Sequence, residues 1–211
     1  VIDGTVEMPK AWVSDGNGVW KQKLDFEPFQ MFHDDTLVYV ARWPDAKFED
    51  GSIWRMMECM RSADGGWDKH KNKWVGKTRF GLLYDDRFHR PETPGFREGD
   101  SRYQVNPEIS FQNQPKSLAE SGKDFTDCVA VLNIGHWRTW ARQITDHSTG
   151  QDHFLYDTTG LPEEQVQQFS GYYILGLAAL DRANEWWFDS ETKTVYYMPP
   201  KKMDPNAMEL R

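Results

Sequence analysis

The chain has 211 residues and a net charge of −8 at pH 7, and only 38% of its residues are hydrophobic although it contains ten Trp, eight Tyr and twelve Phe. This acidic balance disfavours nonspecific nucleic-acid binding, which needs a basic surface against phosphates. No apolar run approaches the roughly 20 residues of a membrane helix. We therefore expect neither a nucleic acid nor a membrane as partner, and a core filled by aromatic rather than aliphatic side chains.

An aromatic-rich chain punctuated by Gly and Pro is typical of all-β proteins. We expect a mostly antiparallel, sandwich-like or barrel-like fold with one or two short helices and a long irregular middle segment. The whole chain, 1–211, is predicted to form a single β-rich domain with an irregular insert at about 61–125. Because it starts without Met and shows no signal peptide, we expect that it begins within a longer protein.

Local patterns predict several elements in the N-terminal part of the chain. A Gly-rich turn at 14–18 precedes an alternating strand at 19–24, and two strands pair across the compact turn Asp34-Asp35. A further short strand is expected at the N-terminus. The predicted strands lie at 1–7, 19–24, 29–33 and 36–42.

A basic run, WDKHKNKWVGKTRF, occupies 67–80 of this acidic chain. Aromatic faces stack on sugar rings, and Lys and Arg meet carboxylates or sulfates by charge and hydrogen bond, so the run suits an anionic polysaccharide. The alternative is a solvated hairpin whose two tryptophans pack inward. The candidate residues are Trp67, Lys69, Lys71, Lys73, Trp74, Lys77 and Arg79.

A second candidate surface follows the apolar run at 129–134, which is typical of a strand covered on both faces. Gly135 predicts a bulge that re-aims the next residues. Strand alternation then places His136, Arg138, Trp140 and Arg142 on one face, as one side of a sugar-binding groove. Alternatively, the tryptophan belongs to the core and the arginines pair with buried carboxylates such as Asp127 or Glu185.

The paired sequences Asp146-His147 and Asp152-His153 face each other across a predicted turn. Two His and two Asp could hold a structural divalent cation, although hydrogen-bonded turn residues explain the same pattern. No other cofactor is expected. The two cysteines, Cys59 and Cys128, either form a disulfide or are separately buried thiols.

The C-terminal part of the chain contains the clearest hairpin. In EWWFDSETKTVYYMPP, at 185–200, two aromatic runs flank a short polar turn, and the prolines end the second strand. One or two helical turns are expected just before it, at 175–181. Other predicted elements are strands at 80–84 and 152–156, a helix at 161–169, a helical turn at 117–121 and a long loop at 87–104.

The hairpin at 185–200 resembles a stretch found in right-handed parallel β-helix proteins of the pectate-lyase-like type, which are glycoside hydrolases and polysaccharide lyases. FQMFHDDTLVYVARWP (29–44) and CVAVLNIGHWRTWARQI (128–144) are similar to two other segments of the same family. In that family these pieces belong to a β-rich domain inserted near the start of the β-helix. The chain has no repeats of solenoid period, so the stacked coils are not expected within it.

The resemblance implies a non-catalytic carbohydrate-binding accessory domain of a secreted or periplasmic polysaccharide-degrading enzyme. Its partners would be a polysaccharide, with the basic run favouring an anionic one, and the rest of the parent β-helix polypeptide. One alternative is a purely structural domain that braces the β-helix and walls its active site, and another is a lyase or hydrolase in its own right. No catalytic residue is assigned, because the sequence contains no nucleophile elbow or zinc-protease motif and the family holds its catalytic residues on the coils.

Overall fold

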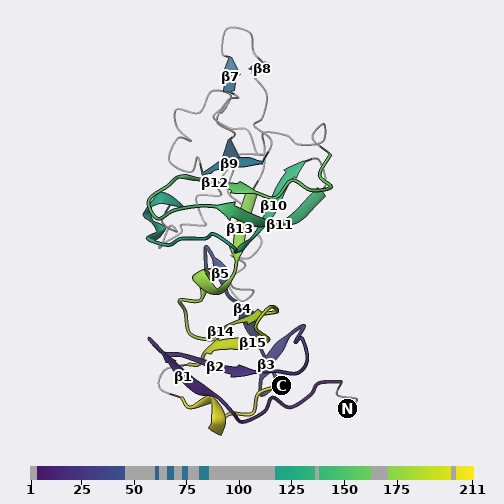
Figure 1. Ribbon diagram of the computed structural model, residues 1–211, viewed down its shortest axis with the longest axis vertical. Helices are drawn as coiled ribbons and strands as arrows, with labels where there is room; N and C mark the ends of the chain where they lie inside the picture. The colour runs from purple at the N-terminus through teal and green to yellow at the C-terminus, as the bar shows by residue number, and fades with distance from the viewer. Residues whose placement is uncertain are drawn as a thin grey trace, which may run out of the picture. The chain divides into compact units, whose positions relative to one another are not determined.

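The computed structural model describes residues 4–45, 60–61, 66–68, 73–75, 81–85, 117–135, 138–162, 171–200 and 203–211. These residues belong to two compact units, unit 1 (Val1–Trp43 and Leu175–Arg211) and unit 2 (Pro44–Ile174). Figure 1 shows that both are built from strands. Among the described residues, the only helical elements are short 3₁₀ turns, and the other regular elements are strands. The expected all-β fold is therefore confirmed. No described helix has the length and apolar character needed to cross a membrane.

Unit 1 contains a mixed sheet with the strand order β1-β2-β15-β14-β4-β3. Neighbouring strands in this sheet run antiparallel, except for β14 and β4, which run parallel. Thus the sheet joins the first and last parts of the chain. The strands are β1 (Val13–Gly16), β2 (Val19–Lys23), β3 (Met31–His33), β4 (Thr36–Val40), β14 (Glu185–Asp189) and β15 (Thr194–Met198), with the short β5 (Arg42–Trp43) following β4.

The hairpins of unit 1 form where the turn residues accept left-handed backbone. Asn17 has φ 50° between β1 and β2, and Asp34 has φ 52° between β3 and β4. Asp189 closes the β14–β15 turn, since its Oδ1 accepts hydrogen bonds from the backbone N–H groups of Glu191 and Thr192. The hairpins β3–β4 and β14–β15 confirm the two predicted in this unit, and the strand predicted at 19–24 is β2, whose partner β1 was not predicted. The strand expected at 1–7 is wrong over its described part, because residues 4–7 are irregular.

The chain termini close the core of unit 1. Met8 N–H donates to the carbonyl of Leu210, and Arg211 exchanges two backbone hydrogen bonds with Phe32. One face of the sheet packs on these segments. The core contains Met8, Trp12, Leu24, Met31, Val38, Trp186, Val195, Tyr197, Met208 and Leu210.

Unit 2 contains a second sheet, in which the strand order is β13-β10-β11-β12-β9-β6. The central pair β10–β11 is antiparallel, with a register shift between Leu132 and Gly135, where a bulge is expected. A separate two-stranded sheet pairs β7 with β8. The strands are β6 (Met60–Arg61), β7 (Gly66–Asp68), β8 (Lys73–Val75), β9 (Leu82–Asp85), β10 (Val129–Gly135), β11 (Arg138–Asp146), β12 (His153–Tyr156) and β13 (Gly171–Leu175).

The described core is mixed rather than predominantly aromatic. Tyr172, Tyr197, Phe125 and Phe154 are its largest fully buried side chains, but Leu, Ile, Val, Met and Ala fill much of the remaining interior. The expectation of an aromatic rather than aliphatic core is therefore wrong. Aromatic rings are the largest of these buried side chains, and aliphatic side chains are the more numerous.

Short 3₁₀ turns lie where helical turns are expected, at 117–121 and 175–181. They are η3 (Ala119–Ser121), η5 (Leu177–Ala179) and η6 (Pro205–Ala207), of which η6 has no counterpart in the sequence-based expectations. The loop expected at 87–104 and all but the first two residues of the helix expected at 161–169 lie outside the described residues, as does Cys59. Cys128 is buried in unit 2.

Candidate functional site

The basic run at 67–80 is described only at its two short strands. β7 and β8 pair so that Trp67 lies opposite Trp74 and Asp68 opposite Lys73. This register shows that the run forms a hairpin around these positions. The other candidate cations of the run, Lys69, Lys71, Lys77 and Arg79, lie outside the described residues.

The candidate face on β11 is described from Arg138 onward, whereas His136 lies outside the described residues. Arg138 is exposed, and Trp140 and Arg142 are half-buried on the same face, two residues apart. Because residues paired across antiparallel strands project from one face, this face is shared with Leu132, which is opposite Trp140, and with Ala130, which is opposite Arg142. Leu132 and Ala130 are fully buried.

The face on β11 thus passes from a core at one end to solvent at the other. Ile144, two residues beyond Arg142, is fully buried, whereas Arg138 is exposed. Trp140 lies between Arg138 and Arg142 along this face, and exposure increases toward Arg138. An indole flanked by cations can stack on a sugar ring while the guanidinium groups meet its carboxylate or sulfate.

The carboxylates named as alternative partners of these arginines have other contacts. Asp127 accepts a hydrogen bond from Gln143 Nε2 at 3.2 Å. Glu185 belongs to unit 1, where Arg182 Nη2 lies 3.3 Å from its Oε1. In unit 2, Arg142 Nη1 donates to the carbonyl of Ala141 at 2.7 Å.

Asp157 supplies a negative charge near Arg142. Hydrogen bonds from the backbone and hydroxyl of Thr159 hold the pKa of Asp157 below its ordinary value, and Arg142 adds a smaller effect of the same sign. Arg142 therefore already has an acidic neighbour, and the negative charge of Asp157 would repel an anion that binds beside it.

The two Asp-His pairs do not combine into one constellation. His147 is 1% exposed, and its Nδ1 accepts the backbone N–H of Phe125 at 3.1 Å. His153 instead contacts Asp152, with 2.8 Å between Nδ1 and Oδ1. Within the described ranges these four residues do not form a group with metal-ligand spacing. The turn interpretation fits their contacts, because Gln151 N–H donates to the carbonyl of Ser148.

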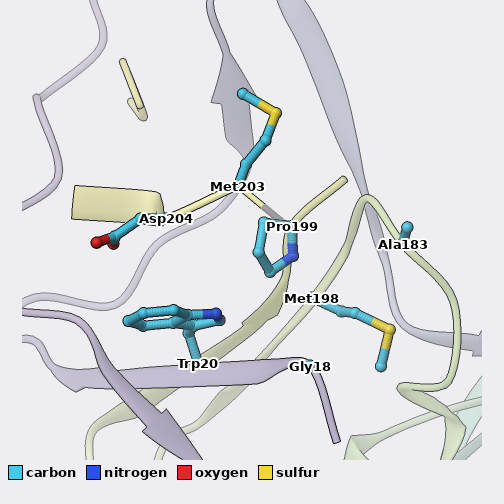
Figure 2. A pocket seen from close by; sticks show the side chains of 7 residues that line it. All are labelled: Gly18, Trp20, Ala183, Met198, Pro199, Met203 and Asp204. Carbon is cyan, nitrogen blue, oxygen red and sulfur yellow. The ribbon is translucent and has the colours of Figure 1, made fainter. Parts of the chain in front are cut away.

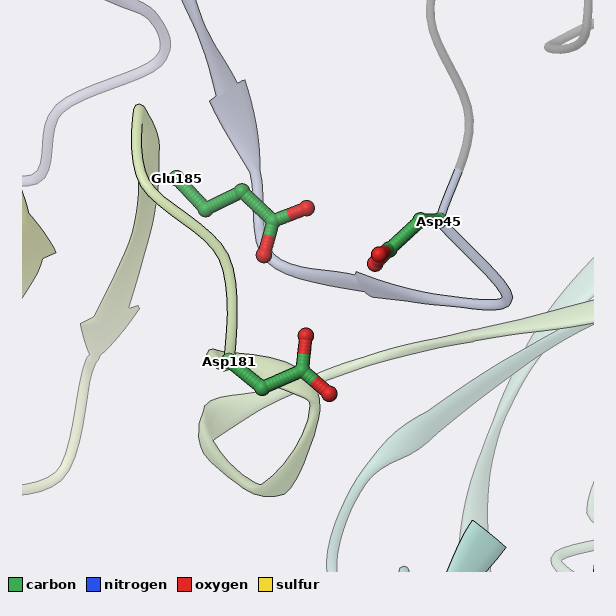
Figure 3. A group of neighbouring side chains, drawn as sticks. All are labelled: Asp45, Asp181 and Glu185. Atoms are coloured by element: carbon green, nitrogen blue, oxygen red, sulfur yellow. The ribbon is translucent and has the colours of Figure 1, made fainter. Parts of the chain in front are cut away.

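Glu185 is a fully buried carboxylate at the start of β14. Its partner Arg182 also lies over the ring of Tyr39, 5.8 Å from the ring centre. An oxygen of Asp181 lies within 4.8 Å of one of Glu185, and Figure 3 shows both side chains. A buried carboxylate requires a compensating charge, so Arg182 has a structural role in unit 1.

A pocket of about 510 Å³ in unit 1 has no counterpart in the sequence-based candidates. It is lined by Gly18, Trp20, Ala183, Met198, Pro199, Met203 and Asp204. Figure 2 shows the indole of Trp20 on one side and Pro199, Met203 and Asp204 on the other. The only local signal is a tryptophan next to a Gly-rich turn, and no sequence pattern links Trp20 to Asp204, which lies 184 residues after it.

Comparison with known proteins identifies no family for this chain. No protein-family model matches it, and no curated protein does. One solved chain, described as a glycoside hydrolase, matches with a TM-score of 0.49 and 16% identity, over 97% of this chain and 30% of that chain. This chain therefore spans less than a third of that chain's length, and a likeness at this level assigns no activity to it.

Proposed function

We propose that this chain is a non-catalytic accessory module that binds a polysaccharide, and more specifically an anionic one. The observation that carries the proposal is the arrangement on β11, where Arg138 and Arg142 flank a half-buried tryptophan. Stacking supplies affinity for the sugar ring, and charge-assisted hydrogen bonds select the carboxylate or sulfate. The basic run at 67–80, in which Trp67 pairs with Trp74, is a second candidate region with the same preference.

The wider setting of the proposal is a secreted or periplasmic β-helix enzyme. Its support is the ordered resemblance of three segments, each of which contains part of a hairpin in the structure: β3–β4, β10–β11 and β14–β15. In that setting the module holds the substrate near coils that carry the catalytic residues. The rest of the parent polypeptide is its second partner.

Affinity electrophoresis and calorimetry against alginate, pectin, carrageenan and a neutral glycan test the proposal. The wild-type chain is expected to bind at least one anionic polymer, and Arg138→Gln to weaken that binding about tenfold through the lost charge-assisted hydrogen bonds. Thr139→Ala, an exposed change on the opposite face of the same strand, is the matched control. Absence of binding to every polymer would remove the glycan-binding function.

The structural alternative has an observation of its own. Trp140 and Arg142 share their face with the fully buried Leu132 and Ala130. A tryptophan in such a position can be part of the core of unit 2. In that case the chain braces the parent enzyme and binds no glycan alone. Trp140→Ala would then lower the melting temperature, while Arg138→Gln would change neither stability nor binding.

A further inference from the structure

We propose that the pocket of unit 1 binds an uncharged sugar ring, stacked on Trp20 and hydrogen-bonded to Asp204. The inference rests on the proposed function in assuming a carbohydrate ligand, but it uses none of the residues on β11 or the β7–β8 hairpin. It adds a second subsite with a different charge preference. The volume of about 510 Å³ falls in the range of roughly 300–1,000 Å³ typical of small-molecule sites.

The indole of Trp20 is anchored on one side by the sheet. Trp20 lies opposite Tyr197 on β15 and Ser14 on β1, and it packs against the core of unit 1. Tyr197 is fully buried, whereas Trp20 is only half-buried. The ring is therefore held in place by its neighbours while part of it lines the pocket, as a rigid stacking surface requires.

Asp204 is also held in place before any ligand binds. Its Oδ1 accepts hydrogen bonds from the backbone N–H and from Nδ2 of Asn206, at 2.9 and 3.0 Å. Asn206 in turn exchanges two hydrogen bonds of 3.0 Å with the backbone of Trp12. Within the described part of the chain, Oδ2 of Asp204 accepts no hydrogen bond, so one carboxylate oxygen is left to receive a donor from a ligand.

Apart from Asp204, the other residues that line the pocket are apolar. Pro199 is conformationally restricted, and Gly18 has φ +84° with nothing within 4 Å of the position of an added Cβ. Met198 and Met203 are polarisable and fit irregular surfaces. Together with Trp20 they supply apolar surface that can contact the C–H face of a pyranose ring.

The charge of the described lining favours one kind of sugar. Its described lining residues include one carboxylate and no Lys, Arg or His. Sugar hydroxyls donate to a carboxylate, whereas the carboxylate or sulfate of an acidic sugar would be repelled by Asp204 at close range. An uncharged ring is therefore the ligand that fits both the indole and the carboxylate.

Calorimetric titration of the full chain with neutral tetrasaccharides (cellotetraose, mannotetraose, galactotetraose), and with tetragalacturonate as the anionic probe, tests the inference. At least one neutral probe is expected to bind. Asp204→Asn is expected to weaken the affinity for that probe about tenfold, because one charge-assisted hydrogen bond is lost. Asn retains Oδ1, which caps η6, so the fold should survive this change. Ala183→Phe enlarges an exposed lining side chain and is expected to block the pocket without removing a core contact.

Phe29→Ala is the matched control, because Phe29 is a 91% exposed residue of unit 1 away from the pocket lining. If no neutral probe binds, or if binding survives both pocket variants, the inference is wrong. Tighter binding of tetramethylammonium than of any sugar would also overturn it, since an indole beside a carboxylate can hold a cation. Binding of tetragalacturonate that Arg138→Gln weakens, without neutral binding, leaves the proposed function standing and removes only this inference.

Discussion

At the scale of single residues, His147 shows how a titratable group in this chain serves the fold. Its Nδ1 accepts the backbone N–H of Phe125, and its own backbone exchanges hydrogen bonds with the hydroxyl of Thr126. Both interactions fix the turn that leads into β10. Burial lowers the pKa of His147 below its ordinary value, so folding favours the neutral imidazole.

A pH-dependent stability follows from this lowered pKa. As the pH falls through about 6.5, the ordinary pKa of His, the unfolded chain takes up a proton that the folded chain excludes. The free energy of unfolding therefore falls with decreasing pH until His147 is protonated in the folded state as well. Urea unfolding of the wild type at about pH 8 and about pH 5.5 should show this loss.

His147→Asn tests the assignment, because the amide oxygen replaces Nδ1 as acceptor but does not titrate in this range. We expect the variant to show a smaller difference in stability between the two pH values than the wild type. Thr126→Val is the matched control, since it removes the hydroxyl contact and leaves the imidazole in place. If His147→Asn shows the same difference in stability between the two pH values as the wild type, the pH dependence comes from other groups.

At the scale of elements, unit 1 contains buried polar side chains on the core face of its sheet. Gln22 and Trp186 are each 4% exposed and Tyr197 is fully buried. Among the residues that the structure describes, none is a hydrogen-bond partner of the Tyr197 hydroxyl, and burial raises the pKa of this hydroxyl. A buried hydroxyl without a partner costs stability relative to an apolar group of the same shape.

Tyr197→Phe is therefore expected to leave the free energy of unfolding unchanged or to raise it by about 1 kcal/mol. The ring contact with Trp12, at 5.9 Å between centres, is retained in the variant. Tyr197→Leu is the comparison, and it should destabilise because it removes that contact and leaves a cavity. Denaturant unfolding of the three proteins measures the effect, and destabilisation by Tyr197→Phe would mean that the hydroxyl has a partner in solution.

The hairpins were predictable from sequence because their signals are local. Asn17, Asp34 and Asp189 lie within a few residues of the strands that they join, and turn chemistry acts over that distance. The parallel pair β14–β4 has no such signal, since Glu185 pairs with Tyr39 far along the chain. Tertiary packing decides this pairing, and sequence patterns do not record it.

The same distinction separates the candidate sites. Alternation along one strand was enough to place Arg138, Trp140 and Arg142 on a common face. The pocket of unit 1 could not be predicted in this way, because it brings Trp20 together with Asp204 only after the termini close the core. The share of aliphatic side chains in the core could not be predicted either, because the number of aromatic residues in a sequence does not show which residues are buried.

At the scale of the whole molecule, the chain is acidic, while its candidate glycan contacts on β11 are cationic. Unit 1 holds a pocket with one carboxylate, and unit 2 holds the arginines of β11. The proposed preferences of the two units are therefore opposite. An anionic glycan recruited by arginine should bind more weakly at high ionic strength, because salt screens exposed charges, whereas a neutral ring stacked on Trp20 should not.

Calorimetric titration of the wild-type chain with oligogalacturonate at about 0.05 M and about 0.5 M salt tests whether the arginines of β11 bind an anionic glycan. We expect binding at low salt that weakens severalfold at high salt, with Arg138→Gln showing weaker binding and a smaller salt effect. Absence of binding at low salt, or binding that neither salt nor Arg138→Gln changes, would contradict this expectation.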